Sequence, residues 1–191
     1  MRGCREAALS GYRVAGTTIA LIGMVAMLAA LVLAWPDPKW LIAVGLLNAA
    51  ALCAAAFRWR MPAMHAGAIA CAAVVYLVTF HWAAGHLAGG DRAQLGSRMF
   101  EAIFGASSGT ALVGLFLAVG VASEVLARIG YRRHGLVYAW GGAVLAVVGL
   151  TLVMFHGVRN GAADALRAAI LYGIYGAGSA ALAPRLRHIA M

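Results

Sequence analysis

Leu77-Val78-Thr79-Phe80-His81 ends one long apolar run of this chain, and Leu152-Val153-Met154-Phe155-His156 ends another, 75 positions later. Each copy places a histidine where its apolar run stops. Long apolar runs are typical of helices that cross a bilayer, because about 20 apolar residues in a helix span its hydrocarbon core. The two copies therefore mark equivalent ends of two predicted transmembrane helices.

The whole chain of 191 residues has this apolar character. Its residues are 64% hydrophobic and 11% charged, whereas a soluble domain is about 45–50% apolar and about 25% charged. A soluble core does not need so much apolar surface, but helices surrounded by lipid do. The composition therefore predicts an integral membrane protein of the all-α class, a polytopic helical bundle whose partner is the lipid bilayer.

The net charge of +9 does not indicate a nucleic-acid partner. Arg and Lys stand in short groups between apolar runs, whereas a nucleic-acid interface needs a contiguous basic surface. The three cysteines include no Cys-x-x-Cys pair, so neither a disulfide framework nor a zinc site is expected.

Six apolar runs predict six transmembrane helices within a single membrane domain, residues 1–191. Their approximate ranges are 14–35, 40–57, 64–83, 104–127, 136–156 and 165–183. The first run is longer than the core of a cleaved signal peptide, so a retained helix is expected. Trp35-Pro36-Asp37-Pro38-Lys39-Trp40 predicts a tight turn, because proline ends one helix and suits the first turn of the next. The longest connection, residues 85–100, is expected to lie partly on the membrane surface.

The positive charges predict the orientation, because cytoplasmic segments of membrane proteins are enriched in Lys and Arg. With the N-terminus inside, ten of the 15 basic residues lie in cytoplasmic segments: Arg2, Arg5, Arg13, Arg58, Arg60, Arg128, Arg132, Arg133, Arg185 and Arg187. The other five lie outside: Lys39, Arg92, Arg98, Arg159 and Arg167. We therefore expect a multi-pass protein of the cell (inner) membrane with both termini in the cytoplasm.

Residues 37–111 and 112–183 are predicted to be internal repeats. At an offset of 75, Leu41-Ile42-Ala43-Val44-Gly45 aligns with Phe116-Leu117-Ala118-Val119-Gly120, as do the two copies that end in Phe-His. Each unit holds two helices, so the units run in the same direction and form a parallel two-helix repeat. Incomplete units at both ends predict packing against other membrane helices or a second copy, as a homo-oligomer.

His81 and His156 are candidate ligands for a haem or metal, because histidines at matched depth on two helices can share one. The alternative is an interfacial histidine near the last carbonyls of its helix. His86 follows His81 by five positions, a spacing that keeps two side chains apart on a helix. His65 and His134 are expected on the opposite side of the membrane. No cofactor other than this haem or metal is indicated.

Asn48, Ser123 and Glu124 are the polar candidates within the predicted spans. A polar group at that depth is a candidate for substrate contact or proton coupling. The alternatives are structural: an ion pair of Glu124 with Arg128, four residues on, and hydrogen bonds of Asn48 and Ser123 across helices.

Motifs of known enzymes are missing from the sequence, among them a phosphate-binding loop, HExxH and GxSxG. Glycines at spacings such as Gly105 and Gly109, or Gly142 and Gly149, favour close helix packing instead. The predicted function is a multi-pass protein without a catalytic site, either a small transporter-like module or a subunit of a membrane assembly. The alternative is an electron-transfer subunit that binds haem or a metal through His81 and His156.

Overall fold

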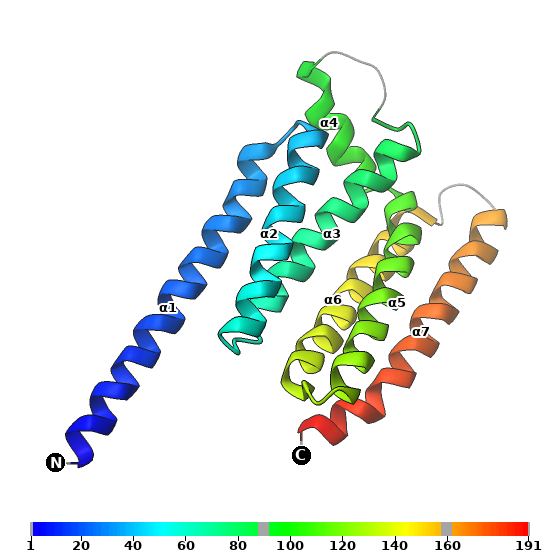
Figure 1. Cartoon of the computed structure of the whole chain (residues 1–191). Helices are drawn as coiled ribbons and strands as arrows, with labels where there is room; N and C mark the ends of the chain where they lie inside the picture. The colour runs from blue at the N-terminus through cyan, green and yellow to red at the C-terminus, as the bar shows by residue number, and fades with distance from the viewer. Residues whose placement is uncertain (1, 88–91, 158–161, 191) are drawn as a thin grey trace.

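The computed structural model describes residues 2–87, 92–157 and 162–190. The regular secondary structure in these ranges is entirely α-helical (Figure 1). The helices are α1 (Arg2–Ala34), α2 (Pro38–Arg58), α3 (Met64–Ala83), α4 (Arg92–Ile103), α5 (Ala106–Arg128), α6 (Arg132–Gly157) and α7 (Ala162–Ala190). The predicted all-α class is confirmed.

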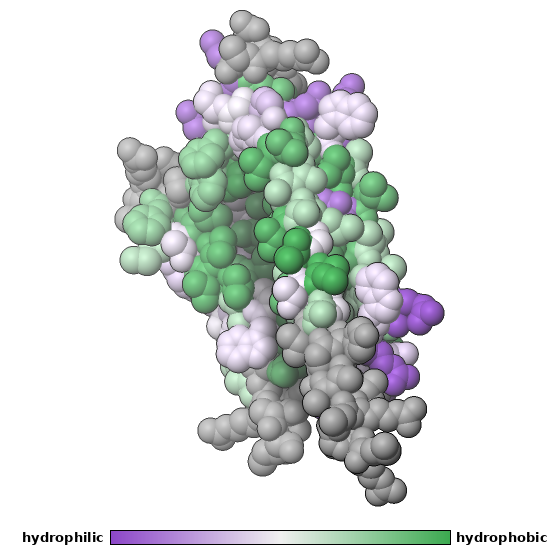
Figure 2. Space-filling model, turned by 90° about the vertical axis from the view of Figure 1, so that its left-hand side faces the viewer, coloured by the Kyte–Doolittle hydropathy of each residue, from purple (hydrophilic) through white to green (hydrophobic). Residues whose placement is uncertain are grey.

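Five of the described helices are long and apolar enough to cross a membrane. These spans are Ala15–Ala34, Pro38–Arg58, Met64–Ala83, Ala106–Arg128 and Arg132–Phe155. They coincide closely with the first five predicted ranges. On the face seen from the α1 side, an apolar band lies between hydrophilic patches (Figure 2). The helices are thus of the type that membrane proteins use.

The predicted sixth span, residues 165–183, forms part of α7 but is not among these five. Helix formation there is confirmed, whereas a sixth membrane crossing stays a prediction.

The turn between α1 and α2 follows the prediction from its prolines. α1 ends at Ala34, and Pro38 begins α2, where the missing proline N–H costs nothing. The side chain of Asp37 caps α2 by accepting a hydrogen bond from the Lys39 N–H at 3.0 Å. An N-cap carboxylate of this kind stabilises a helix start by about 1 kcal/mol.

The two ends of the bundle differ. Arg2 of α1, Ala190 of α7 and the α2–α3 and α5–α6 turns lie at one end, here named the terminal end (Figure 1). Helix α4 lies at the opposite end, named the loop end (Figure 1). The sequence did not predict this helix, because Gly96 interrupts its short apolar pattern. The buried Met99 holds α4 on the bundle by packing with Leu41, Val78 and Leu87.

The long helices form two halves of three. Helices α1, α2 and α3 pack around one apolar cluster that includes Leu31, Leu52 and Met64. Helices α5, α6 and α7 pack around a second, centred on Phe116 and Tyr175. A third cluster joins α3 to α5 and α6: Ile69, Leu77, Ala111, Leu112, Val119 and Leu145. Helix α3 is therefore the element through which the two halves meet.

The α2–α3 and α5–α6 turns have the same backbone hydrogen bonds. In both, the helix ends in a Schellman motif with its left-handed residue at Arg60 (φ +52°) or Gly130 (φ +95°). The closing bonds run from Met61 N–H to Ala56 O at 3.0 Å and from Tyr131 N–H to Leu126 O at 2.8 Å. These turns correspond at an offset of 70 rather than 75. The predicted gapless repeat is therefore not confirmed, because α6 has 26 residues where α3 has 20.

Close helix approach at glycines is confirmed between α5 and α6. A Cβ on Gly109 would lie 3.0 Å from the Gly149 carbonyl oxygen, and a Cβ on Gly135 would lie 2.8 Å from the Ser123 carbonyl oxygen. Both neighbours are backbone atoms, which cannot move aside as a flexible side chain can. Small residues at these positions therefore set the distance between the two helices.

Candidate functional site

Helix α3 carries a buried histidine near each of its ends. His65 is its second residue and His81 lies two residues before its end, and both are 0% exposed. At 1.5 Å per residue the two are separated by about 24 Å along the helix. Each histidine bonds to a residue of the other half of the bundle, so each is the centre of a polar cluster.

The loop-end cluster consists of His81, His86 and Ser108. His81 Nδ1 lies 2.9 Å from His86 Nδ1, and His81 Nε2 lies 2.7 Å from Ser108 Oγ. Ser108 donates its single hydroxyl proton to the Ala102 carbonyl oxygen at 2.9 Å. Its oxygen must then accept from His81 Nε2–H, which leaves His81 Nδ1 to accept from His86. Both ring nitrogens of His81 are therefore engaged.

The contact between His81 and His86 follows from the way α3 ends. Gly85 has a φ of +77°, and His86 N–H donates to the His81 carbonyl oxygen at 3.0 Å. This is a Schellman motif, in which the chain reverses and brings residues five apart together. The expectation that their spacing keeps the two histidines apart is wrong, because α3 stops between them. Gly85 just before His86 was the available signal.

The terminal-end cluster consists of Cys53, His65, His134 and Tyr138. His65 Nε2 lies 2.9 Å from His134 Nδ1, and His65 Nδ1 lies 3.3 Å from the Tyr138 hydroxyl. The Cys53 sulfur lies 3.8 Å from that hydroxyl and 3.9 Å from His65 Nδ1. His134 also stacks on Phe57, with ring centroids 5.2 Å apart and 8° between the planes. The cluster thus connects α2, α3 and α6.

The sequence reasoning missed this second cluster. It placed His65 and His134 on the same side of the membrane but did not pair them. The signal was present, since His65 and His134 begin two helices that each follow an arginine-containing turn. Periodicity alone does not show which two helix starts adjoin, so the pairing depended on how α3 packs on α6.

His81 and His156 belong to the last turns of α3 and α6, as predicted. His156 belongs to α6, but its side chain lies outside the described residues. Within the described part of the chain, no three His, Cys, Asp or Glu side chains are arranged to hold a metal ion. Haem or metal binding by His81 and His156 stays a prediction, and it would require His81 to give up one of its two hydrogen bonds.

The other polar candidates all have partners. Glu124 accepts a hydrogen bond from Arg128 Nε at 2.7 Å, which confirms the ion pair expected from their spacing. Asn48 donates across helices to the Met27 carbonyl oxygen at 2.7 Å, and Ser123 donates to the Gly135 carbonyl oxygen at 2.7 Å. The predicted cross-helix bonds are therefore present. Asn48 bonds toward α1 and Ser123 toward α6, so the two are not structurally equivalent.

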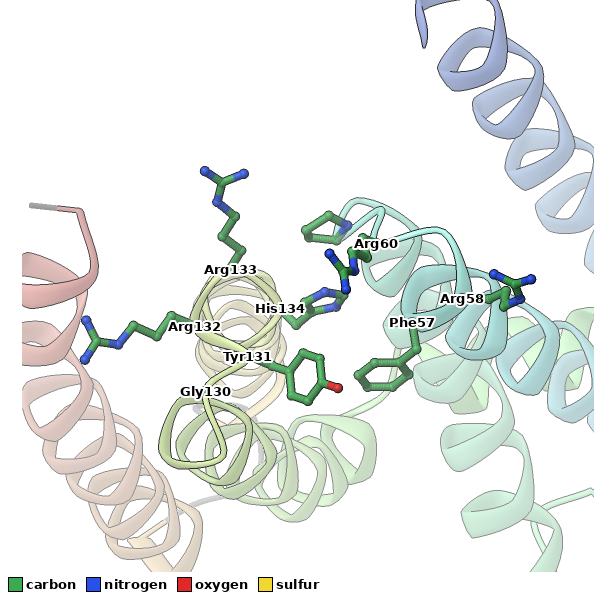
Figure 3. A pocket seen from close by; sticks show the side chains of 9 residues that line it. Phe57, Arg58, Arg60, Gly130, Tyr131, Arg132, Arg133 and His134 are labelled. Carbon is green, nitrogen blue, oxygen red and sulfur yellow. The ribbon is translucent and has the colours of Figure 1, made fainter.

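A basic pocket opens beside the terminal-end cluster. It has a volume of about 690 Å³ and lies between the α2–α3 and α5–α6 turns. Its lining consists of Phe57, Arg58, Arg60, Pro62, Gly130, Tyr131, Arg132, Arg133 and His134. The Arg60 side chain reaches toward the His134 ring, whereas Arg58, Arg132 and Arg133 extend outward in different directions (Figure 3). Four arginines and no carboxylate line this pocket, so its charge favours an anion over a cation.

Comparison of the chain with protein-family models, with curated proteins and with solved structures found no match. The function is therefore argued from the two histidine clusters, the basic pocket and the helix surfaces.

Proposed function

We propose that this chain is a non-catalytic module of a membrane assembly, a six-span helical unit whose buried histidines serve structure. The observation that supports this most directly is the pair of histidine clusters on α3. His65 bonds to α6 at the terminal end and His81 bonds to α5 at the loop end. The two clusters thus connect the three-helix halves at both ends of the helix that joins them.

The hydrogen bonding of these groups supports a structural role. In lipid, a polar side chain without a partner costs several kcal/mol. Among the described residues, no buried side-chain nitrogen or oxygen lacks a hydrogen-bond partner. The bonds run between helices, as in His65 with His134 and Asn48 with Met27. Groups used in this way hold helices in register.

The outermost helices supply the surface for assembly. Large aliphatic side chains cover the outer faces of α1 and α7: Ile19, Ile22, Val25, Val32, Leu33, Leu166 and Ile170, each at least 55% exposed. Helices α1 and α7 stand at the two outer edges of the bundle (Figure 1). In a membrane these faces meet lipid or another helix. In the proposed assembly, helices of a second copy or of another membrane protein pack there.

Native mass spectrometry of the purified full chain in mild detergent tests the proposal. We expect masses of two or more copies, or of the chain with another membrane protein. A single sharp monomer mass at all protein concentrations would contradict the proposal. An absorption spectrum after expression with added haem tests the alternative function. A Soret band in the unmodified chain that is lost in both His81→Phe and His156→Phe would show that these histidines bind haem. It would favour an electron-transfer role over a structural one.

A further inference from the structure

Helices α3 and α6, whose starts adjoin the basic pocket, carry an apolar groove on the membrane-spanning surface. The groove lies between α3 and α6 and has a volume of about 500 Å³. Small side chains of α3 form one wall and larger ones of α6 the other: Ala66, Ala70, Ala73, Val137, Trp140 and Val144. Trp140 and Val144 are 62% and 60% exposed, so the groove is open toward the surrounding lipid.

Helical periodicity aligns the groove with the pocket. Pro62 lines the pocket from the turn before α3, and Ala66, four positions later in the first turn of α3, begins the groove. Arg133 lines the pocket and Val137 begins the groove, again four positions on. Residues four apart lie one above the other on a helix. The pocket is therefore at the terminal end of the same α3–α6 face that carries the groove.

The length of the groove fits one leaflet. It extends along α3 from Ala66 to Leu77, which is about 16 Å at 1.5 Å per residue. One leaflet contributes half of the hydrocarbon core, about 15 Å. A molecule with a negative headgroup and an acyl chain of that length would match the charge of the pocket and the apolar lining of the groove together.

The backbone at Arg60 points to the same site. Arg60 adopts the left-handed conformation at φ +52°, and the equivalent position of the α5–α6 turn is Gly130. Glycine takes this conformation without strain, but a residue with a Cβ does not. Strained residues of this kind cluster at functional sites, and the Arg60 side chain lies beside His134 (Figure 3).

We propose that this face binds an anionic phospholipid. Arg60, which reaches toward His134, binds the headgroup phosphate, and Arg133, which extends outward from the pocket rim (Figure 3), turns toward the bound headgroup. The positive N-terminal end of α6, which begins at Arg132, assists them. One acyl chain lies in the groove between Ala70 and Val144. The site borders the terminal-end cluster, because His134 lines the pocket, but it does not depend on the proposed assembly role.

Lipid retention by the purified full chain tests this site. The protein is delipidated in detergent, titrated with phosphatidylglycerol or phosphatidylcholine, and the bound lipid is counted by native mass spectrometry. We expect phosphatidylglycerol to bind at least tenfold more tightly, because the arginines repel the choline cation of phosphatidylcholine and a difference of about 1.4 kcal/mol corresponds to a factor of ten. Equal affinity for the two lipids would overturn the proposal.

Variants separate the headgroup from the chain. Arg60→Gly keeps the turn geometry and should weaken phosphatidylglycerol binding about tenfold, and Arg133→Gln should do the same. Arg167→Gln removes one charge from α7 and should leave binding unchanged. If Arg60→Gly and Arg133→Gln bind as the unmodified chain does, the pocket does not hold the phosphate.

The groove has its own matched pair of variants. Ala70→Leu fills the groove and should weaken phosphatidylglycerol binding, while Ala54→Leu adds the same bulk to an exposed position of α2 and should not. Inorganic phosphate serves as the probe for a headgroup-only site. If phosphate at millimolar concentration displaces the lipid completely, or if Ala70→Leu binds normally, the acyl chain does not occupy the groove and the proposal fails.

Discussion

Replacement of His134 by phenylalanine removes the nitrogen that faces His65 but keeps a ring that can stack on Phe57. His65 is 0% exposed and its Nε2 lies 2.9 Å from His134 Nδ1. Without His134 that nitrogen stays buried without this partner. A buried polar group that loses its partner costs about 1–3 kcal/mol. We therefore expect His134→Phe to lower the free energy of unfolding by about 2 kcal/mol.

A double-mutant cycle isolates the bond itself. His65→Phe should lower the free energy of unfolding by a similar amount, because His134 Nδ1 loses its partner and the Tyr138 hydroxyl keeps only the Cys53 sulfur. The double variant removes both members, so its cost should be smaller than the sum of the single costs by about 1–2 kcal/mol. Unfolding in mixed micelles, by titration with a denaturing detergent and tryptophan fluorescence, measures all three variants.

A second cycle serves as the control. Thr79 is exposed on α3, on the same helix as His65. Thr79→Val combined with His134→Phe should be additive within about 0.5 kcal/mol. If the His65 and His134 variants are additive to the same degree, the terminal-end cluster does not couple α3 to α6, and the reasoning is refuted.

Three further perturbations use the same unfolding measurement. Ser108→Ala should lower the free energy of unfolding by about 1–3 kcal/mol, because it removes the acceptor of the buried His81 Nε2–H. As a control, Ser107→Ala should change it by less than about 0.5 kcal/mol. Gly149→Ala should cost about 1–3 kcal/mol, since its Cβ would lie 2.7 Å from Cζ of the fully buried Tyr175, and an unchanged midpoint would show that the ring moves aside. Arg60→Gly should raise stability by about 0.5–1 kcal/mol by relieving the left-handed backbone, so a loss of stability would mean that the Arg60 side chain holds the turn.

The ends of the long helices were largely predictable. Pro38 and Asp37 begin α2 where the sequence placed a turn, and α3 was predicted over its observed range, 64–83. These boundaries depend on local chemistry. A helix in lipid continues while its residues are apolar and stops where proline, glycine or arginine makes water the better environment.

The partners of the polar residues were only partly predictable. Glu124 and Arg128 share one helix, so their ion pair followed from spacing alone. The bond between His65 and His134 joins residues 69 positions apart. This bond forms only where α3 packs against α6. Other packings of the same helices would keep the two histidines apart. Helix α4 was missed for a related reason, because Met99 packs on α2 and α3 and Gly96 lies against the α1–α2 turn, and local sequence shows neither contact.

By itself, the sequence of this protein determined its class, the extent of five apolar helices and the turns between them, because the transfer of each helix into lipid depends on its own residues. The repeated Phe-His segments marked two helix ends in this way. Only the tertiary structure decided that α3 joins two halves, that its two histidines bond to α5 and α6, and that the arginines of two turns line one pocket. These features depend on helix packing, where small differences at glycines such as Gly109 and Gly149 select one arrangement among many.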